Sequence, residues 1–259
     1  MVSTPRQDKA PITGARHHDP IGEVSQDELA TMYEAAAELL ECQRVLAKTR
    51  DNVVTEVLRG EPTFQQWEHY PRGDVFDPET HSQFYYHTHV AHERVAGEHG
   101  HFHTFVRPAG LSLGVSPAPV PDFQPPAREM DLVAHLVGVS VDAFGQVFRL
   151  FTTNRWVTAE TWYAADDVIR MLDHFDMDLG RPSWPLNRWL TATLRLFRPQ
   201  IRELIRERDI RVAHHQEAHP DTNVYEDRSL NVTSEVRVSV EEQVEAIEAR
   251  LGLGDYEMV

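Results

Sequence analysis

Two short segments with alternating histidines constrain the fold of this chain more than any other feature of its sequence. His87 and His89 end the segment SQFYYHTH, and His99, His101 and His103 alternate in HGHFHTFVR. Residues two apart in a β-strand point to the same face. The aromatic residues of FYYHTH also favour a strand over a helix. The sequence therefore predicts two strands, at 83–89 and 99–106, each with its imidazoles on one face.

An antiparallel pairing of these strands would bring the two sets of histidines together. One register places His87 opposite His101, and a slip of two residues places His87 opposite His103 instead. Cβ atoms of directly opposed residues are about 4.5–5.5 Å apart, which suits shared coordination of one metal ion. His99 and His103 are about 13 Å apart along a strand, so the same ion cannot easily bind both. A helix over 84–96 is the alternative, and it would bring His89 near His92.

Imidazole is a good ligand for zinc, copper and iron, and four imidazoles without metal on a sheet face would need many polar partners. Glu93 and Glu98 are nearby oxygen ligands or acceptors for the histidines, whereas the single cysteine, Cys42, excludes a cysteine cage. The predicted cofactor is therefore one ion of Fe, Cu or Zn. The candidate metal ligands are His87, His89, Glu93, His99, His101 and His103.

The rest of the chain predicts an α+β fold, in which an antiparallel sheet packs with N-terminal and C-terminal helices. A flexible tail is expected at 1–22 and one domain at 23–259, with loops at 61–82 and 108–130. Hydrophobic periodicity and capping residues predict helices at 26–48, 164–175, 185–206 (interrupted at Pro199) and 239–251. Further strands are predicted at 132–141, 146–156 and 229–238.

Charge and hydropathy exclude several classes of partner. The formal net charge is −16, which argues against nucleic acid and anionic membranes because both need basic patches. No apolar run approaches the roughly 18 residues of a membrane span, and the N-terminal residues contain no apolar core of a secretory signal. We therefore expect a cytoplasmic protein that acts on a small molecule, and its oligomeric state stays open.

Two further residues are candidates for catalysis. His135 lies in a predicted strand, and Arg155 lies in the polar run TTNRWVT at the end of another. Each could orient a substrate or neutralise its charge. The alternative for Arg155 is a structural pair with a carboxylate, with Trp156 filling the core.

The segment around His87 resembles the first cupin motif, HxH(x)3E(x)6G. His87, His89 and Glu93 occupy its ligand positions and Gly100 its final glycine, whereas His81 stands where cupins have the leading glycine. The resemblance implies a metal held by these residues inside a β-barrel. The second cupin motif is not recognisable, and His135 is the strand histidine that could replace its ligand.

The chain also resembles a bacterial family described only as a domain of unknown function. The resemblance rests on YYHTHVAHERVAGEHGHFHTF, HLVGVSV, FTTNRWVTAETW and VYEDRSLNVTSEV. It implies a single domain and no particular activity.

These observations predict a metal-dependent enzyme of the oxidoreductase or oxygenase type. A metal-dependent hydrolase and a non-catalytic metal-binding or storage protein are the alternatives. A third alternative is a structural protein whose histidines are hydrogen-bonded or respond to pH.

Overall fold

The computed structural model describes residues 21–253 and confirms the α+β class. Six strands form one antiparallel sheet in chain order, so each strand neighbours the next along the chain. The strands are β1 (Tyr70–Phe76), β2 (Ser82–His87), β3 (Gly100–Val106), β4 (Ala134–Val141), β5 (Val147–Thr153) and β6 (Val232–Arg237). The helices are α1 (Gln26–Ala47), α2 (Val53–Val57), α3 (Arg155–Thr158), α4 (Ala165–Leu172), α5 (Trp184–Leu196), α6 (Arg198–Ala218) and α7 (Val240–Leu251).

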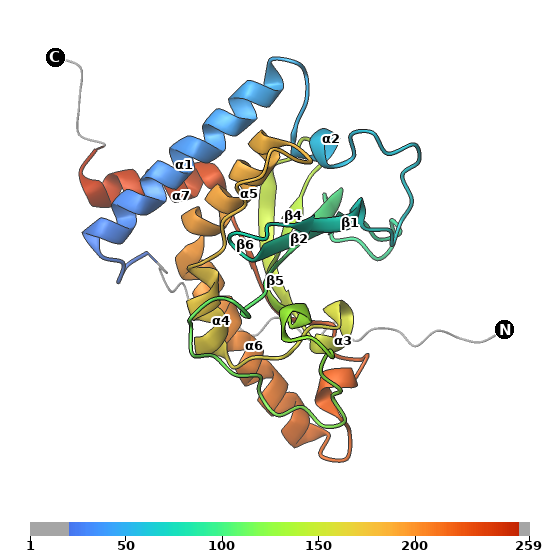
Figure 1. The fold of residues 1–259 in the computed structure, drawn as a ribbon. Coiled ribbons are helices and arrows are strands. Elements are labelled where there is room, and N and C mark those ends of the chain that lie inside the picture. The colour runs from blue at the N-terminus through green and yellow to red at the C-terminus, as the bar shows by residue number, and fades with distance from the viewer. Residues whose placement is uncertain (1–20, 254–259) are drawn as a thin grey trace.

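A layer of helices covers one face of the sheet (Figure 1). The side chains that point into this layer are apolar, and the ring of Phe102 on β3 lies 5.8 Å from that of Trp189 on α5. Tyr86, Phe102, Val139 and Leu150 are completely buried in this core. Burial of this apolar face is the main force that holds the helices on the sheet.

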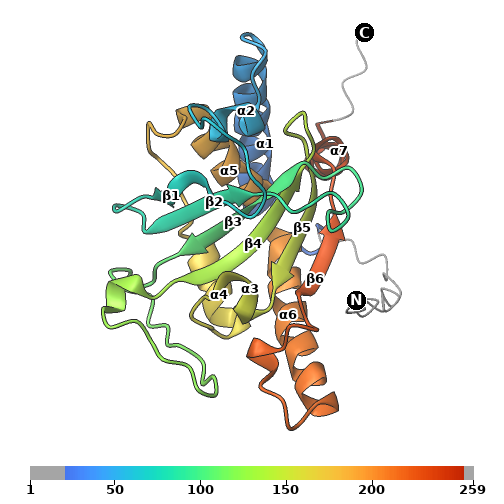
Figure 2. The ribbon, with the colours of Figure 1, turned by 90° about the vertical axis from the view of Figure 1, so that its right-hand side faces the viewer.

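The opposite face of the sheet is turned toward the viewer in Figure 2, where the strands follow one another from β1 to β6. Because successive residues of a strand alternate between faces, the neighbours of the core residues point to this side. They include His87, His101 and His103, so we call it the histidine face.

Most predicted elements are present, with small differences at their ends. β5 stops at Thr153 rather than at 156, because the Asn154 side chain accepts a hydrogen bond from the Arg155 backbone and begins α3. The predicted helix at 185–206 is two helices, α5 and α6, and Pro199 lies in the first turn of α6, where its missing N–H costs little. The helix also continues to Ala218, beyond the predicted end.

The sequence did not predict β1. Pro71 and Gly73 interrupt its pattern, but proline is tolerated in an edge strand, and β1 is at the edge of the sheet. Of the predicted tail at 1–22, all but the last two residues lie outside the described part of the chain. Within residues 21–253, no helix has the length and apolar character to cross a membrane.

Candidate metal centre

The pairing of β2 with β3 brings His87 and His101 directly opposite each other, which is the first of the two predicted registers. His103 is opposite Tyr85 in the same pair of strands, on the same face. Ring nitrogens of the three histidines all lie within 4.8 Å of one another, and all three residues are buried. His87, His101 and His103, the histidine triad from here on, can therefore hold a metal ion.

Hydrogen bonds orient two of these rings. The Nε2 atoms of His87 and His101 are 2.7 Å apart, and Nδ1 of His101 lies 3.3 Å from Oε1 of Glu98. An ionised carboxylate only accepts, so His101 carries its proton on Nδ1 and its Nε2 lone pair faces His87. A carboxylate behind a ligand histidine is the usual way to fix the tautomer of that ligand and strengthen its basicity.

His103 is oriented by a fourth buried histidine, His135 on β4. Nδ1 of His103 lies 3.0 Å from Nε2 of His135. The backbone N–H of His135 in turn donates to the buried carboxylate of Glu160, at 2.6 Å. The hydrogen bond to His135 engages Nδ1 of His103 and leaves its Nε2 as the atom available to a metal.

Aromatic packing closes the inner side of the histidine triad. The Phe151 ring lies 5.1 Å from the ring of His101 and 5.7 Å from that of His103. Phe151 occupies this place because its partner across the sheet is Gly138, at which a Cβ atom would lie 2.3 Å from the ring. The Tyr85 ring also packs against the triad, 5.2 Å from the ring of His103.

The site favours neutral imidazoles. Burial, reinforced by the neighbouring His101, lowers the pKa of His87 to about 2, and burial lowers the pKa of His103 well below its ordinary value. Burial and the charge of Arg208 lower the pKa of His135 to about 3. Neutral imidazole is the form that binds metal, so these rings need not lose a proton to the solvent at neutral pH.

The charge behind His101 is negative and partly balanced. Burial opposes the ionisation of Glu98, but the hydrogen bonds of His101 and Ser140 and the charge of Arg149 outweigh it and lower the pKa of Glu98 to about 2. The guanidinium of Arg149 is 3.9 Å from Glu98 and 2.6 Å from Glu235 on β6. A fixed carboxylate therefore stands behind the candidate ligand at neutral pH.

The other candidate ligands are placed differently. β2 ends at His87, so His89 lies beyond the strand, yet its ring is 4.9 Å from that of His87. Glu93 is 3.6 Å from Nδ1 of His89, on the outer side of the group. The structure does not bring His99 to the histidine triad. His99 precedes β3, and its Nδ1 is hydrogen-bonded to the hydroxyl of Tyr86, whose side chain lies on the core face.

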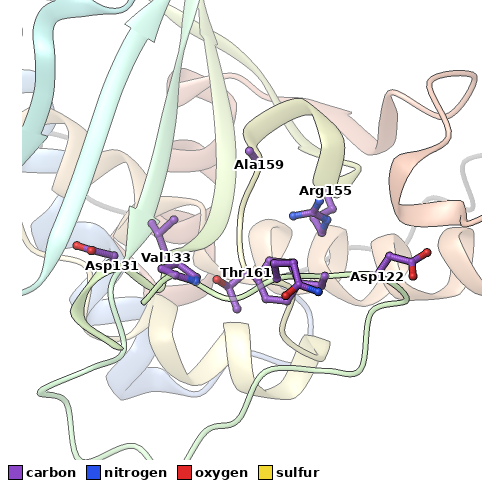
Figure 3. A pocket seen from close by; sticks show the side chains of 9 residues that line it. Asp122, Asp131, Val133, Arg155, Ala159 and Thr161 are labelled. Carbon is purple, nitrogen blue, oxygen red and sulfur yellow. The ribbon is translucent and has the colours of Figure 1, made fainter. Parts of the chain in front are cut away.

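The contacts of Arg155 are with residues outside the histidine triad. It pairs with Glu226, donates to the backbone carbonyl of Glu160 at 3.0 Å and lies over the Phe123 ring. It also lines a pocket of about 260 Å³, in which Figure 3 shows it projecting from α3 beside Asp122 and Thr161. The alternative interpretation of Arg155, a structural pair with a carboxylate, matches these contacts.

Sequence analysis missed two residues at the site. The Trp67 ring is 6.5 Å from that of His87, and the His69 ring is 5.9 Å from it. Both precede β1 in the segment expected to be a loop. Their only signal in the sequence is the presence of two aromatic rings two residues apart, and periodicity cannot relate such a pair to a distant strand.

Comparisons with known proteins agree with the resemblance to an uncharacterised family and give no support to the cupin resemblance. In the described residues the sheet is open, with β1 and β6 at its edges. No curated protein and no solved structure gives a significant match. A family model does match residues 33–238, a range that includes all six strands of the sheet. The chain belongs to the family described as "Domain of unknown function (DUF6969)".

Proposed function

We propose that the chain is a metal-dependent enzyme that uses a single transition-metal ion on the histidine face. The observation that carries the proposal is the histidine triad, with three buried imidazoles whose ring nitrogens lie within 4.8 Å of one another. Nitrogen ligands of a tetrahedral zinc ion, each about 2.0–2.1 Å from the metal, are about 3.4 Å apart. Small rotations of the three rings would be enough to reach that geometry.

The number of ligands supports an enzyme rather than a storage protein. Structural zinc sites usually have four protein ligands, whereas catalytic sites have three and leave a position open. A transition metal with such an open position supplies Lewis-acid or redox chemistry to a small molecule. We favour an oxidoreductase or oxygenase because all three ligands are imidazoles, which suit iron and copper as well as zinc. The substrate is then a small molecule rather than nucleic acid.

The first test is elemental analysis of protein purified without a histidine tag or chelating resin. We expect one transition-metal ion per chain in the wild type and a loss of stoichiometric binding in His101→Ala. The matched control is His92→Ala, because its side chain is 82% exposed and belongs to the same histidine-rich segment. Equal metal content in all three proteins would reject the assignment of the histidine triad.

A titration with acid tests the ligand type. Burial lowers the pKa of His87 to about 2 and that of His103 well below the ordinary value of about 6.5, so protons compete with metal for these imidazoles only in strong acid or when the chain unfolds. Release of the ion should therefore take up more than one proton, which calorimetry in two buffers of different ionisation enthalpy measures. Uptake of less than one proton per ion would argue against a site made of several histidines.

A further inference from the structure

The rings that contact the histidine triad differ in exposure, and this difference defines the side from which a substrate can approach. Tyr85 and Phe151 are 5% and 3% exposed, so they close the inner side. By contrast, Trp67 is 53% exposed, and the side chain of His69 is 44% exposed. Trp67 and His69 therefore offer exposed aromatic surface beside His87, which a small molecule arriving from solvent can contact.

Trp67 is held in this position by its backbone. Its φ angle is 70°, in the left-handed region that bulky residues rarely adopt, and its N–H donates to the carbonyl of Thr88 at 3.0 Å. Its ring centroid is 4.2 Å from that of His89, with the two planes inclined at 64°. Unfavourable backbone conformations of this kind cluster at binding and catalytic sites.

His69 stands beside it as a second flat surface. Its ring is stacked on Tyr85, with 3.6 Å between centroids and an angle of 7° between planes. Tyr85 is fixed in β2, so the stack fixes the plane of His69 as well. Trp67 and His69 thus present two oriented rings next to His87.

Two carboxylates lie beside the histidine rings at this entrance. Asp74 lies 3.1 Å from Nδ1 of His69, and Glu93 lies 3.6 Å from Nδ1 of His89. Carboxylates in this position repel an anionic substrate, whereas the exposed indole surface favours a planar apolar one.

We propose that Trp67 and His69 form the entrance of a substrate site that takes a planar, uncharged aromatic group and stacks it on Trp67 beside the histidine triad. This inference rests on the proposed function, because it assumes a metal with an open position at the triad. It adds the chemical class of the substrate.

The test uses two metal-chelating probes with the same hydroxamate group, benzohydroxamate, which carries a phenyl ring, and acetohydroxamate, which carries a methyl group in its place. Their affinities for the zinc-loaded protein are measured by calorimetry. Stacking of one aromatic pair contributes enough to give a preference of about 5- to 10-fold for benzohydroxamate. We expect Trp67→Ala to bring the ratio of the two affinities close to one while the affinity for acetohydroxamate stays the same.

Trp184 provides the matched control, because it is 52% exposed but belongs to α5 in the helical layer. Trp184→Ala should keep the wild-type preference. Trp67→Leu, which retains apolar bulk without a planar ring, should lose it, and serves as the second variant if Trp67→Ala does not fold.

Two contrary results are distinguishable. An unchanged preference in both Trp67 variants would overturn the aromatic site and leave the metal enzyme intact. Failure of both probes to bind a wild-type protein that retains its zinc would show a closed coordination sphere, and would overturn the proposed enzyme together with this inference.

Discussion

The two faces of the sheet are formed by alternate residues of the same strands, yet their chemistry is opposite. On β3, Phe102 points into an apolar core beneath the helices, while its neighbours His101 and His103 point into a cluster of imidazoles. Both faces are buried at this point, so burial alone does not distinguish them. The apolar face gains free energy from burial, whereas the histidine face needs a hydrogen-bond partner for each buried polar atom. The comparison indicates that the helix-covered face stabilises the fold, and the histidine face holds the residues that could bind a metal ion.

The largest expected effect comes from removing a core side chain from the helix-covered face of the sheet. Phe102→Ala should lower the free energy of unfolding by about 3–5 kcal/mol, because it leaves a cavity in the core. It should nevertheless keep the stabilisation by zinc, which is about 4 kcal/mol when free zinc is 1,000 times its dissociation constant. Denaturant unfolding with and without zinc measures both quantities.

His87→Ala is the reciprocal variant, and it should lose the stabilisation by zinc. Its ring is on the histidine face and has no part in the apolar core. If folded Phe102→Ala also failed to respond to zinc, the separation of the two faces would be wrong.

A smaller effect is expected at Glu98, which sharpens the comparison within the histidine face. Glu98→Gln removes the charge behind His101 but keeps a similar shape, and loss of such a supporting group typically weakens metal binding by about 10- to 100-fold. Competition with a chromogenic zinc chelator measures the change.

Glu93→Gln is the matched control, because Glu93 is near His89 but outside the triad. It should change zinc affinity much less than Glu98→Gln. Equal losses in the two variants would mean that Glu93 is itself a ligand, as the cupin resemblance implies.

The sequence predicted much of this site because the relevant strands are regular. Alternation in 83–89 and 99–106 placed His87, His101 and His103 on one face, and one of the two predicted registers is the one observed. The same rule failed at His99, because the ladder of β3 begins at Gly100 and the alternation does not extend beyond it. Periodicity applies only to residues that are inside a strand.

The residues that sequence analysis missed are those positioned by contacts between distant segments. Trp67 and His69 reach the site because β1 pairs with β2, and Pro71 and Gly73 hide β1 in the sequence. The contact between His103 and His135 depends on a shift of register between β3 and β4. Such irregularities are set by packing and leave no pattern in a single sequence.

The smallest expected effect concerns Glu160, whose carboxylate accepts from the backbone of His135. Burial raises the pKa of Glu160 from 4.5 to about 7 against the opposing charge of Arg208. Between these two values the folded chain holds a proton that the unfolded chain has released. The contribution of Glu160 to stability is therefore complete below pH 4.5 and is lost as the pH rises through 7.

The buried histidines act in the opposite direction. The pKa values of His87 and His135 are lowered from 6.5 to about 2 and 3, so their contribution to stability is complete above pH 6.5 and is lost as the pH falls.

Glu160→Gln should therefore remove one of these two opposing dependences and leave the other. Between pH 4.5 and 6.5 the stability of the metal-free protein should rise with pH more steeply than in the wild type. The increase in slope is at most one proton, or about 1.4 kcal/mol per pH unit. Urea unfolding of the metal-free protein at several pH values measures the two slopes, with Glu93→Gln as the control for an exposed carboxylate. Parallel curves for Glu160→Gln and the wild type would show that Glu160 is ionised in the folded protein throughout this range. In that case the buried carboxylate would place a negative charge beside the backbone N–H of His135 at a pH where its raised pKa predicts the neutral acid.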